Sequence, residues 1–136
     1  MLKIRISSFS YIYGRIPADP SENGGGFVFD CRALPNPGRY DEYKKLTGMD
    51  EAVANFLIQE EEVKLFLDHS FALVDQAVTR YLDRGFTSLM ISFGCTGGQH
   101  RSVFSAEQLS LYLADKYEGI IIDLRHWARE EAEKNS

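Results

Sequence analysis

The chain has 136 residues and carries 15 Lys and Arg against 20 Asp and Glu, which gives a formal net charge of −5. This length suits one domain over residues 1–136, and a hydrophobic share of 44% is ordinary for a globular protein, which excludes disorder, collagen and coiled coil. No apolar run reaches the ~20 residues of a membrane helix and the start lacks a signal-peptide core, so we expect a cytoplasmic protein with no membrane partner.

The first part of the chain predicts two strands separated by a loop. Residues 3–9 alternate hydrophobic and polar side chains, which is typical of a strand with one buried face. Residues 14–26 contain two prolines and three consecutive glycines, so they predict a loop. Residues 27–31 are apolar and β-prone, and the two prolines within residues 34–38 end this second strand.

The middle of the chain predicts helices and then a buried strand. From Asp50 the hydrophobic residues follow a helical period, which Gly85 terminates. The acidic run over residues 60–62 indicates a solvated face or a kink between two helices. Residues 88–93 are almost continuously apolar, as in a strand that is covered on both faces.

The last part of the chain predicts a strand–loop–helix–strand unit. A loop over residues 94–101 leads into a helix from Ser102 to about Tyr117, and a buried strand over residues 120–124 follows. A short helix is expected over residues 126–136. The whole chain therefore predicts an α/β layered domain with a mostly parallel sheet of about four strands, all but one of them parallel, flanked by helices.

The loop after the third strand carries the strongest chemical signal. It lies at the carboxyl end of the sheet, where open α/β sheets bind ligands, and its three glycines let the backbone approach an anion closely. Ser102 is the expected N-cap of the following helix, and Arg101 can make a bidentate contact with a phosphate. His126, after the last strand, lies at the same end of the sheet and is a further candidate. The acidic balance argues against broad nucleic-acid binding.

The same loop has a second interpretation as the site of an enzyme. Cys95 and Arg101 have the spacing of the Cys-x5-Arg loop of cysteine-dependent phosphatases, in which the thiolate attacks phosphorus. Gly94 stands where those enzymes usually have His. The aspartates available as a general acid are Asp19, Asp30 and Asp41. Cys95 can equally be an inert small residue, and we expect Cys31 to lie in the core as a free thiol.

Several segments resemble one known family. The loop and helix start over residues 94–103 look like the signature of the C-terminal domain of the RNase adapter protein RapZ family. Residues 29–37 are similar to its Asp-x-Arg-x-Leu-Pro-Asn-Pro motif, and residues 46–51 to its Leu-Thr-Gly-x-Asp segment. Residues 8–17 and 125–126 resemble the opening and the end of that domain, so the resemblance covers nearly the whole chain.

This resemblance implies a phosphosugar sensor that has a regulatory adapter role. The RapZ domain binds glucosamine-6-phosphate and a small regulatory RNA, and it presents that RNA for cleavage. Its sheet resembles the sugar-phosphate subdomain of phosphofructokinase, and such domains assemble through self-contacts, which implies a homodimer. No metal or other cofactor is expected. The candidate ligand-binding residues are Cys95, Thr96, Gly97, Gly98, Gln99, His100, Arg101, Ser102, Asp30, Arg32 and His126.

Three departures from the family limit what can be transferred. The chain has no Gly-x4-Gly-Lys-[Ser/Thr] loop, so nucleotide hydrolysis is not expected. Gly38 and Tyr13 stand where the family has histidines, which bears on sugar specificity. Residues 127–134 carry three glutamates against two basic residues, and this balance disfavours RNA binding.

Three hypotheses follow from the sequence. The first is a binding module for a small phosphorylated metabolite, either an amino-sugar phosphate or a nucleotide sugar. The second is a phosphatase or phosphotransferase that uses Cys95 and Arg101. The third is an RNA-binding adapter module.

Overall fold

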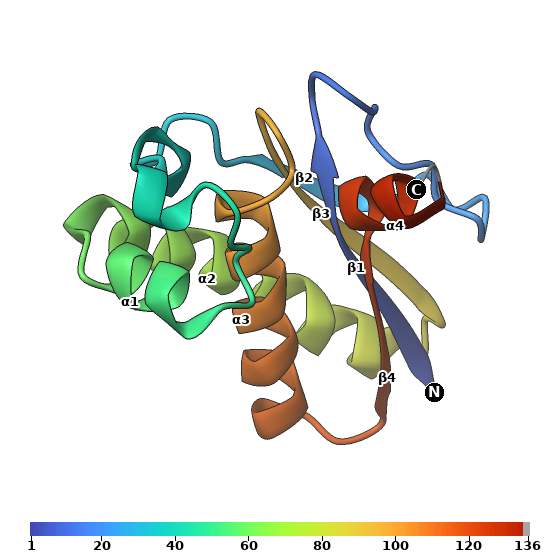
Figure 1. Cartoon of the computed structure of the whole chain (residues 1–136). Coiled ribbons are helices and arrows are strands. Elements are labelled where there is room, and N and C mark those ends of the chain that lie inside the picture. Colours follow the sequence, from blue (N-terminus) through green and yellow to red (C-terminus); the bar gives the residue numbers. More distant parts are fainter. Residues whose placement is uncertain (135–136) are drawn as a thin grey trace.

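The computed structural model describes residues 1–134 and contains a four-stranded sheet in the order β2-β3-β1-β4 (Figure 1). The strands are β1 (Leu2–Ser10), β2 (Gly26–Asp30), β3 (Ser88–Cys95) and β4 (Ile120–His126). All neighbouring strands pair in parallel. The predicted α/β fold with a mostly parallel sheet is confirmed, but the expected antiparallel strand is wrong. After β1 the chain runs through residues 11–25 back to the end of the sheet at which the strands begin. As a result β2 pairs in parallel with β3 and does not form a hairpin with β1.

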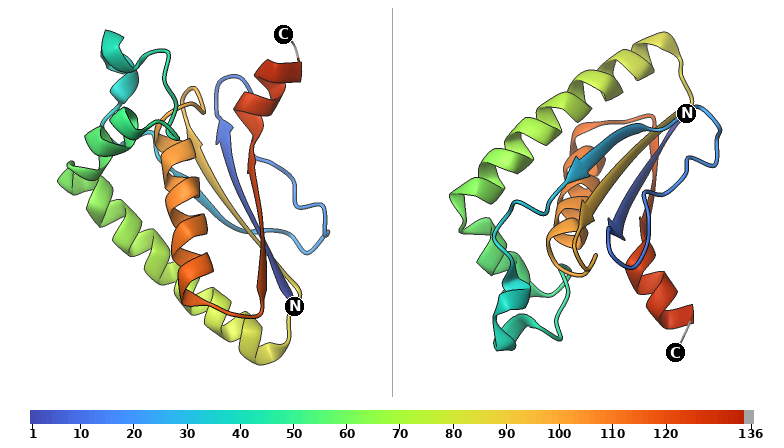
Figure 2. Two further views of the ribbon diagram at one scale, coloured as in Figure 1. Left: turned by 60° about the horizontal axis from the view of Figure 1, so that its bottom comes forward. Right: turned by 90° about the horizontal axis from the view of Figure 1, so that it is seen from above.

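The helices lie mainly on one face of the sheet. These are α1 (Glu51–Ile58), α2 (Glu61–Arg84) and α3 (Arg101–Lys116), while α4 (Trp127–Lys134) follows β4 at the carboxyl end of the sheet. Figure 2 shows α1, α2 and α3 on one side, with the loop over residues 11–25 on the other. Two short 3-10 helices, η1 (Pro37–Arg39) and η2 (Asp41–Tyr43), precede α1. Among residues 1–134, none of the helices combines the length and the apolar composition that a membrane-spanning helix requires.

The core forms between the sheet and the helices because alternate strand residues point to the helical side. Full burial of each large side chain contributes roughly 1.5–3 kcal/mol to the stability. The fully buried core residues from the two central strands include Leu2, Ile4, Ile6, Leu89, Ile91 and Phe93. Residues from the helices that meet them include Val53, Leu57, Val74, Val78, Leu109 and Leu113.

The structure refines the sequence predictions at several element ends. The acidic run does mark a break between two helices, because α1 ends at Ile58 and α2 begins at Glu61. His126 is the last residue of β4, so the final helix begins one residue later than expected. The prediction of a fully buried β4 is wrong: as an edge strand it leaves Ile121 49% exposed.

The carboxyl half of β1 is buried on both faces, although its pattern predicted only one buried face. Ser7, Ser8 and Ser10 are all at most 2% exposed. Ser7 Oγ lies 2.9 Å from Ser92 Oγ of β3, and Ser10 Oγ donates to the carbonyl of Thr96 at 2.7 Å. Small hydroxyl side chains therefore satisfy one another and the backbone where the loops close over the end of the sheet.

Candidate functional site

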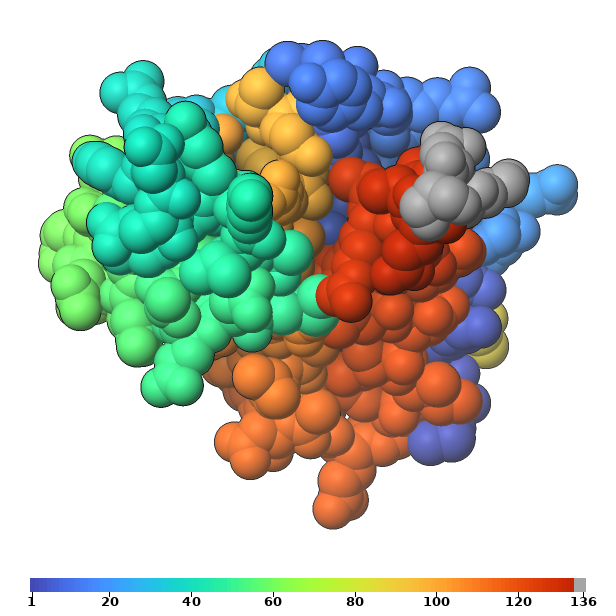
Figure 3. Space-filling model, in the orientation of Figure 1, coloured from blue at the N-terminus to red at the C-terminus, as the bar shows by residue number. Residues whose placement is uncertain are grey.

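The glycine-rich loop joins β3 to α3 at the carboxyl end of the sheet, as the sequence predicts. Figure 3 shows this loop at the surface, between the segment over residues 36–48 and α4. Gly98 has φ +66°, and a Cβ there would lie 2.7 Å from the Cβ of Ala128 and 2.9 Å from the nitrogen of Ser10. Only glycine fits this position, because both the backbone conformation and the contact with β1 exclude a side chain.

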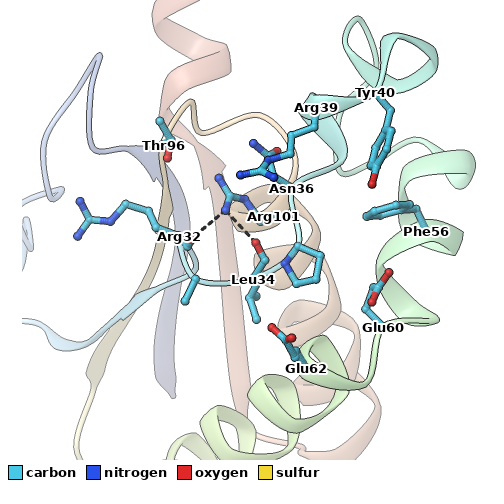
Figure 4. A pocket seen from close by; sticks show the side chains of 12 residues that line it. Arg32, Leu34, Asn36, Arg39, Tyr40, Phe56, Glu60, Glu62, Thr96 and Arg101 are labelled. Atoms are coloured by element: carbon cyan, nitrogen blue, oxygen red, sulfur yellow. Dashed lines mark hydrogen bonds between the residues drawn. The ribbon is translucent and has the colours of Figure 1, made fainter.

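Arg101, the first residue of α3, is the most constrained side chain of the loop. It is only 5% exposed, and its Nη1 donates to the carbonyls of Arg32 at 2.8 Å and Leu34 at 3.0 Å (Figure 4). Its Nε is buried and has no hydrogen-bond partner among residues 1–134. An unpaired donor on a buried cation is costly, so the edge of the guanidinium that carries Nε and Nη2 is suited to an anionic acceptor.

A cavity of about 490 Å³ opens in front of Arg101. The segment after β2, the end of α1, the start of α2 and the glycine-rich loop enclose it, and Figure 4 shows the side chains of Arg39, Asn36 and Arg101 directed toward one space. Its size lies within the range of small-molecule sites. The lining residues are Arg32, Ala33, Leu34, Pro35, Asn36, Arg39, Tyr40, Phe56, Glu60, Glu62, Thr96 and Arg101.

Within this loop, several backbone groups have no partner among the described residues, and of its side chains only Thr96 and Arg101 line the cavity. The carbonyls of Cys95 and Thr96 are occupied, because they accept from the amides of Tyr11 and Ile12. The amides of residues 96–103 donate to no residue in the described part of the chain. Three of them belong to the first turn of α3, where helix geometry always leaves the N–H groups unpaired and gives them partial positive charge.

Cys95 is buried away from the cavity. It is 2% exposed, does not line the cavity, and its Sγ lies 3.1 Å from Ser102 Oγ. The expectation that Ser102 caps α3 is wrong: His100 is the N-cap residue, and Ser102 lies within the first turn with its hydroxyl turned toward the sulfur. Cys31 is buried and free in the core, as predicted, and burial raises the pKa of its thiol strongly.

Two of the three candidate general acids, Asp19 and Asp41, have partners away from the cavity. Asp19 accepts hydrogen bonds from Ser21 and the amide of Gly25 in the loop before β2. Asp41 pairs with Lys44 at 2.9 Å. Neither they nor Asp30 line the cavity.

Asp30 and Arg32 form a bidentate pair at the end of β2. Arg32 Nε donates to Asp30 at 2.9 Å and Nη2 at 2.7 Å, and the guanidinium lies 3.8 Å from the centre of the Tyr11 ring. Hydrogen bonds from Arg32 hold the pKa of Asp30 below its usual value. Asp30 thus neutralises Arg32 at the rim of the cavity, whereas Arg101 and Arg39 form no ion pair with any residue that the structure describes.

Gln99 and His100 turn toward the segment before α1. Gln99 Nε2 donates to the carbonyls of Lys44 and Leu46, both at 2.7 Å, and His100 Nε2 donates to the carbonyl of Tyr43 at 2.8 Å. Gly48 packs directly on this corner, since a Cβ there would clash with the carbonyl oxygen of His100. These two candidate ligand residues therefore fix the segment over residues 43–48 against the start of α3.

His126 joins three elements outside the cavity. Its Nε2 donates to Glu107 Oε1 of α3 at 3.1 Å, and its Nδ1 forms a hydrogen bond of 2.6 Å with Ser8 Oγ of β1. Both ring nitrogens are therefore used within the fold, and none of the three side chains lines the cavity.

Of the twelve residues that line the cavity, only Arg32, Thr96 and Arg101 are among the candidate ligand residues that the sequence predicts. Arg39, Tyr40 and Phe56 lie in segments with no recognised motif, and the acidic run that contains Glu60 and Glu62 indicates only a solvated face or a kink. The sequence signal that bears on Arg39 and Tyr40 is the Pro-Asn-Pro motif, because its prolines restrict the path of the backbone that leads to them.

These features define a class: a parallel α/β domain with a glycine-rich strand-to-helix loop and an arginine-lined cavity at the carboxyl end of the sheet. The chain matches the RapZ C-terminal domain over residues 2–129, and it belongs to this family. The resemblance seen in the sequence is thereby confirmed, and the family indicates a regulatory or binding role.

Several curated relatives share this region. The chain is 45% identical over 107 residues to a nucleotide-binding protein of Thermosipho melanesiensis, a match that covers 79% of this chain and 36% of that protein. It is 39% identical over 123 residues to one of Lactobacillus delbrueckii subsp. bulgaricus, covering 90% of this chain and 39% of that protein. A nucleotide-binding protein of Glaesserella parasuis is 38% identical over 135 residues, covering 99% of this chain and 44% of that protein. The chain thus spans less than half the length of each of these relatives.

Proposed function

We propose that this chain is a cytoplasmic binding module for a small phosphorylated metabolite, which serves a regulatory role. Glucosamine-6-phosphate, an amino-sugar phosphate, and nucleotide sugars are the candidate ligand classes. The observation that carries the proposal is the guanidinium of Arg101, which is buried beside a cavity of about 490 Å³ and leaves Nε unpaired among the described residues.

The energetics favour an oxyanion at this guanidinium. Its Nη1 is held by two carbonyls, so the orientation of Arg101 is fixed before any ligand arrives. A hydrogen bond between charged partners contributes roughly 1.5–3 kcal/mol, and a bidentate contact through Nε and Nη2 makes two of them. Because the side chain is already ordered, little rotamer entropy is lost when the anion binds.

The loop adds a second set of donors. Thr96 lines the cavity, and the amides of residues 96–103 have no acceptor within residues 1–134. The start of α3 adds partial positive charge at the same end of the sheet. A phosphoryl group has enough oxygen atoms to accept from the guanidinium, the Thr96 hydroxyl and loop amides together.

The observations favour binding over hydrolysis by Cys95. The thiol is 2% exposed and outside the cavity, and none of the candidate general acids Asp19, Asp30 and Asp41 lines the cavity. RNA binding is the weaker alternative, because basic residues near the C-terminal helix are paired with acids. Arg125 lies 3.3 Å from Glu130, and Arg129 lies 3.2 Å from Glu133.

Isothermal titration calorimetry tests the proposal with inorganic phosphate, glucosamine-6-phosphate and glucosamine. We expect saturable binding of the two phosphorylated compounds and none of glucosamine, since the sugar alone lacks the anion. Thr96→Val, which removes one hydroxyl at the cavity, should weaken binding, whereas the exposed Arg80→Gln on α2 should leave it unchanged. If neither phosphate compound binds at millimolar concentration, the proposal is wrong.

A further inference from the structure

The cavity contains a second guanidinium that no internal partner neutralises. Arg39 ends η1 and lines the cavity, and its side chain makes no hydrogen bond or ion pair with any residue that the structure describes. Figure 4 shows it directed toward Asn36 and Arg101. Arg32, the third arginine of the cavity, differs from it because Asp30 already accepts from Nε and Nη2 along one edge of that guanidinium.

The neighbouring Asn36 is oriented as a donor. Its Oδ1 accepts from the amide of Gly38 at 2.9 Å, which also caps η1. The Nδ2 amino group therefore remains to face a ligand. Arg39 and Asn36 thus form a donor pair on the Pro-Asn-Pro segment, separate from the pair formed by Arg101 and Thr96 on the glycine-rich loop.

We propose, building on the proposed function, that the site takes a diphosphate ester, with one phosphoryl group at Arg101 and Thr96 and the second at Arg39 and Asn36. Because the two guanidinium groups lie on different segments, each can make its own bidentate contact with the oxygens of one phosphoryl group. Arg39 is then the residue that makes the site prefer a diphosphate over a monophosphate.

The remaining wall fits an uncharged ring carried by the diphosphate. Tyr40 and Phe56 pack with their ring centres 5.7 Å apart and present an aromatic surface to the cavity. Glu60 and Glu62 lie at the end away from Arg39, where their carboxylates can accept hydrogen bonds from ring hydroxyls (Figure 4). The same carboxylates oppose a phosphoryl group at their end of the cavity, so the phosphoryl groups are expected at the arginine end.

The test is calorimetry with inorganic phosphate and pyrophosphate, in magnesium-free buffer at matched ionic strength. The variants are Arg39→Gln and, as the control for a change of net charge, Arg80→Gln on the exposed surface of α2. Loss of a charge-assisted contact should weaken pyrophosphate binding to Arg39→Gln by about tenfold or more. Phosphate binding should fall by less than about threefold, and Arg80→Gln should change neither.

Each other outcome overturns the proposal in a recognisable way. If Arg39→Gln weakens the binding of phosphate and of pyrophosphate equally, Arg39 acts only through its long-range electrostatic field or helps to hold a single phosphoryl group. No change with either anion means that Arg39 does not touch the ligand. In both cases the proposed phosphate site at Arg101 stands, whereas failure of the unsubstituted chain to bind either anion removes both proposals.

Discussion

Replacement of Arg101 by Gln separates the two roles that the structure gives to this side chain. Its Nη1 satisfies the carbonyls of Arg32 and Leu34, so the substitution leaves both acceptors without their donor. An unsatisfied buried acceptor costs about 1–3 kcal/mol, and water from the open cavity relieves part of this, so we expect a loss of about 2–4 kcal/mol. The free energy of unfolding of a domain is about 5–15 kcal/mol, so the variant should still fold.

Urea unfolding in chloride and in phosphate, at equal ionic strength, measures both roles. At a phosphate concentration 100 times the dissociation constant, the unsubstituted chain should gain about 2.7 kcal/mol, because only the folded state binds the anion. Arg101→Gln should be less stable in chloride and gain almost nothing from phosphate. A variant that keeps the full phosphate gain would refute the reasoning, whatever its stability in chloride.

Three further predictions concern other parts of the fold. Gly98→Ala should destabilise the protein by more than about 1 kcal/mol, as its Cβ meets β1 and α4, whereas Gly97→Ala, which meets nothing within 4 Å, should have little effect in the same urea assay. The thiols of Cys31 and Cys95 should react with an aromatic disulfide reagent only after unfolding, since both are buried; fast labelling of the native protein would contradict this. Burial opposes the ionisation of Asp75, but hydrogen bonds from two tyrosines and a lysine outweigh it and lower its pKa. The resulting stability is fully present above the unfolded pKa of about 3.9 and is lost as pH falls through the lower folded pKa, so Asp75→Asn should flatten the acid limb of a stability–pH curve.

The spacing of the hydrophobic residues and the positions of glycine and proline predict most of the fold. The helical spacing, the Gly85 stop and the apolar third strand all correspond to elements in the structure, because each reflects a local preference or burial pattern. The all-parallel pairing could not be predicted in the same way. Strand order depends on where the loop over residues 11–25 returns the chain, and its composition shows only that it is a loop.

The candidate site was predictable in its position but not in its composition. The glycine-rich loop and Arg101 follow from the strand–loop–helix pattern, and the structure places both at the carboxyl end of the sheet. The directions of Gln99 and His100 depend on tertiary contacts with residues 43–48, which no local pattern reveals. Arg39 comes to the cavity only because the preceding segment folds back over the start of α3.

The most direct test of the central claim is a proton–nitrogen NMR titration of the labelled chain with inorganic phosphate. If the loop binds the anion, the Nε–H signal of Arg101 and the amides of residues 96–103 should shift together and reach saturation with one dissociation constant. Shifts that never saturate, or that occur on other segments while the Arg101 signal stays in place, would contradict an oxyanion site at this loop.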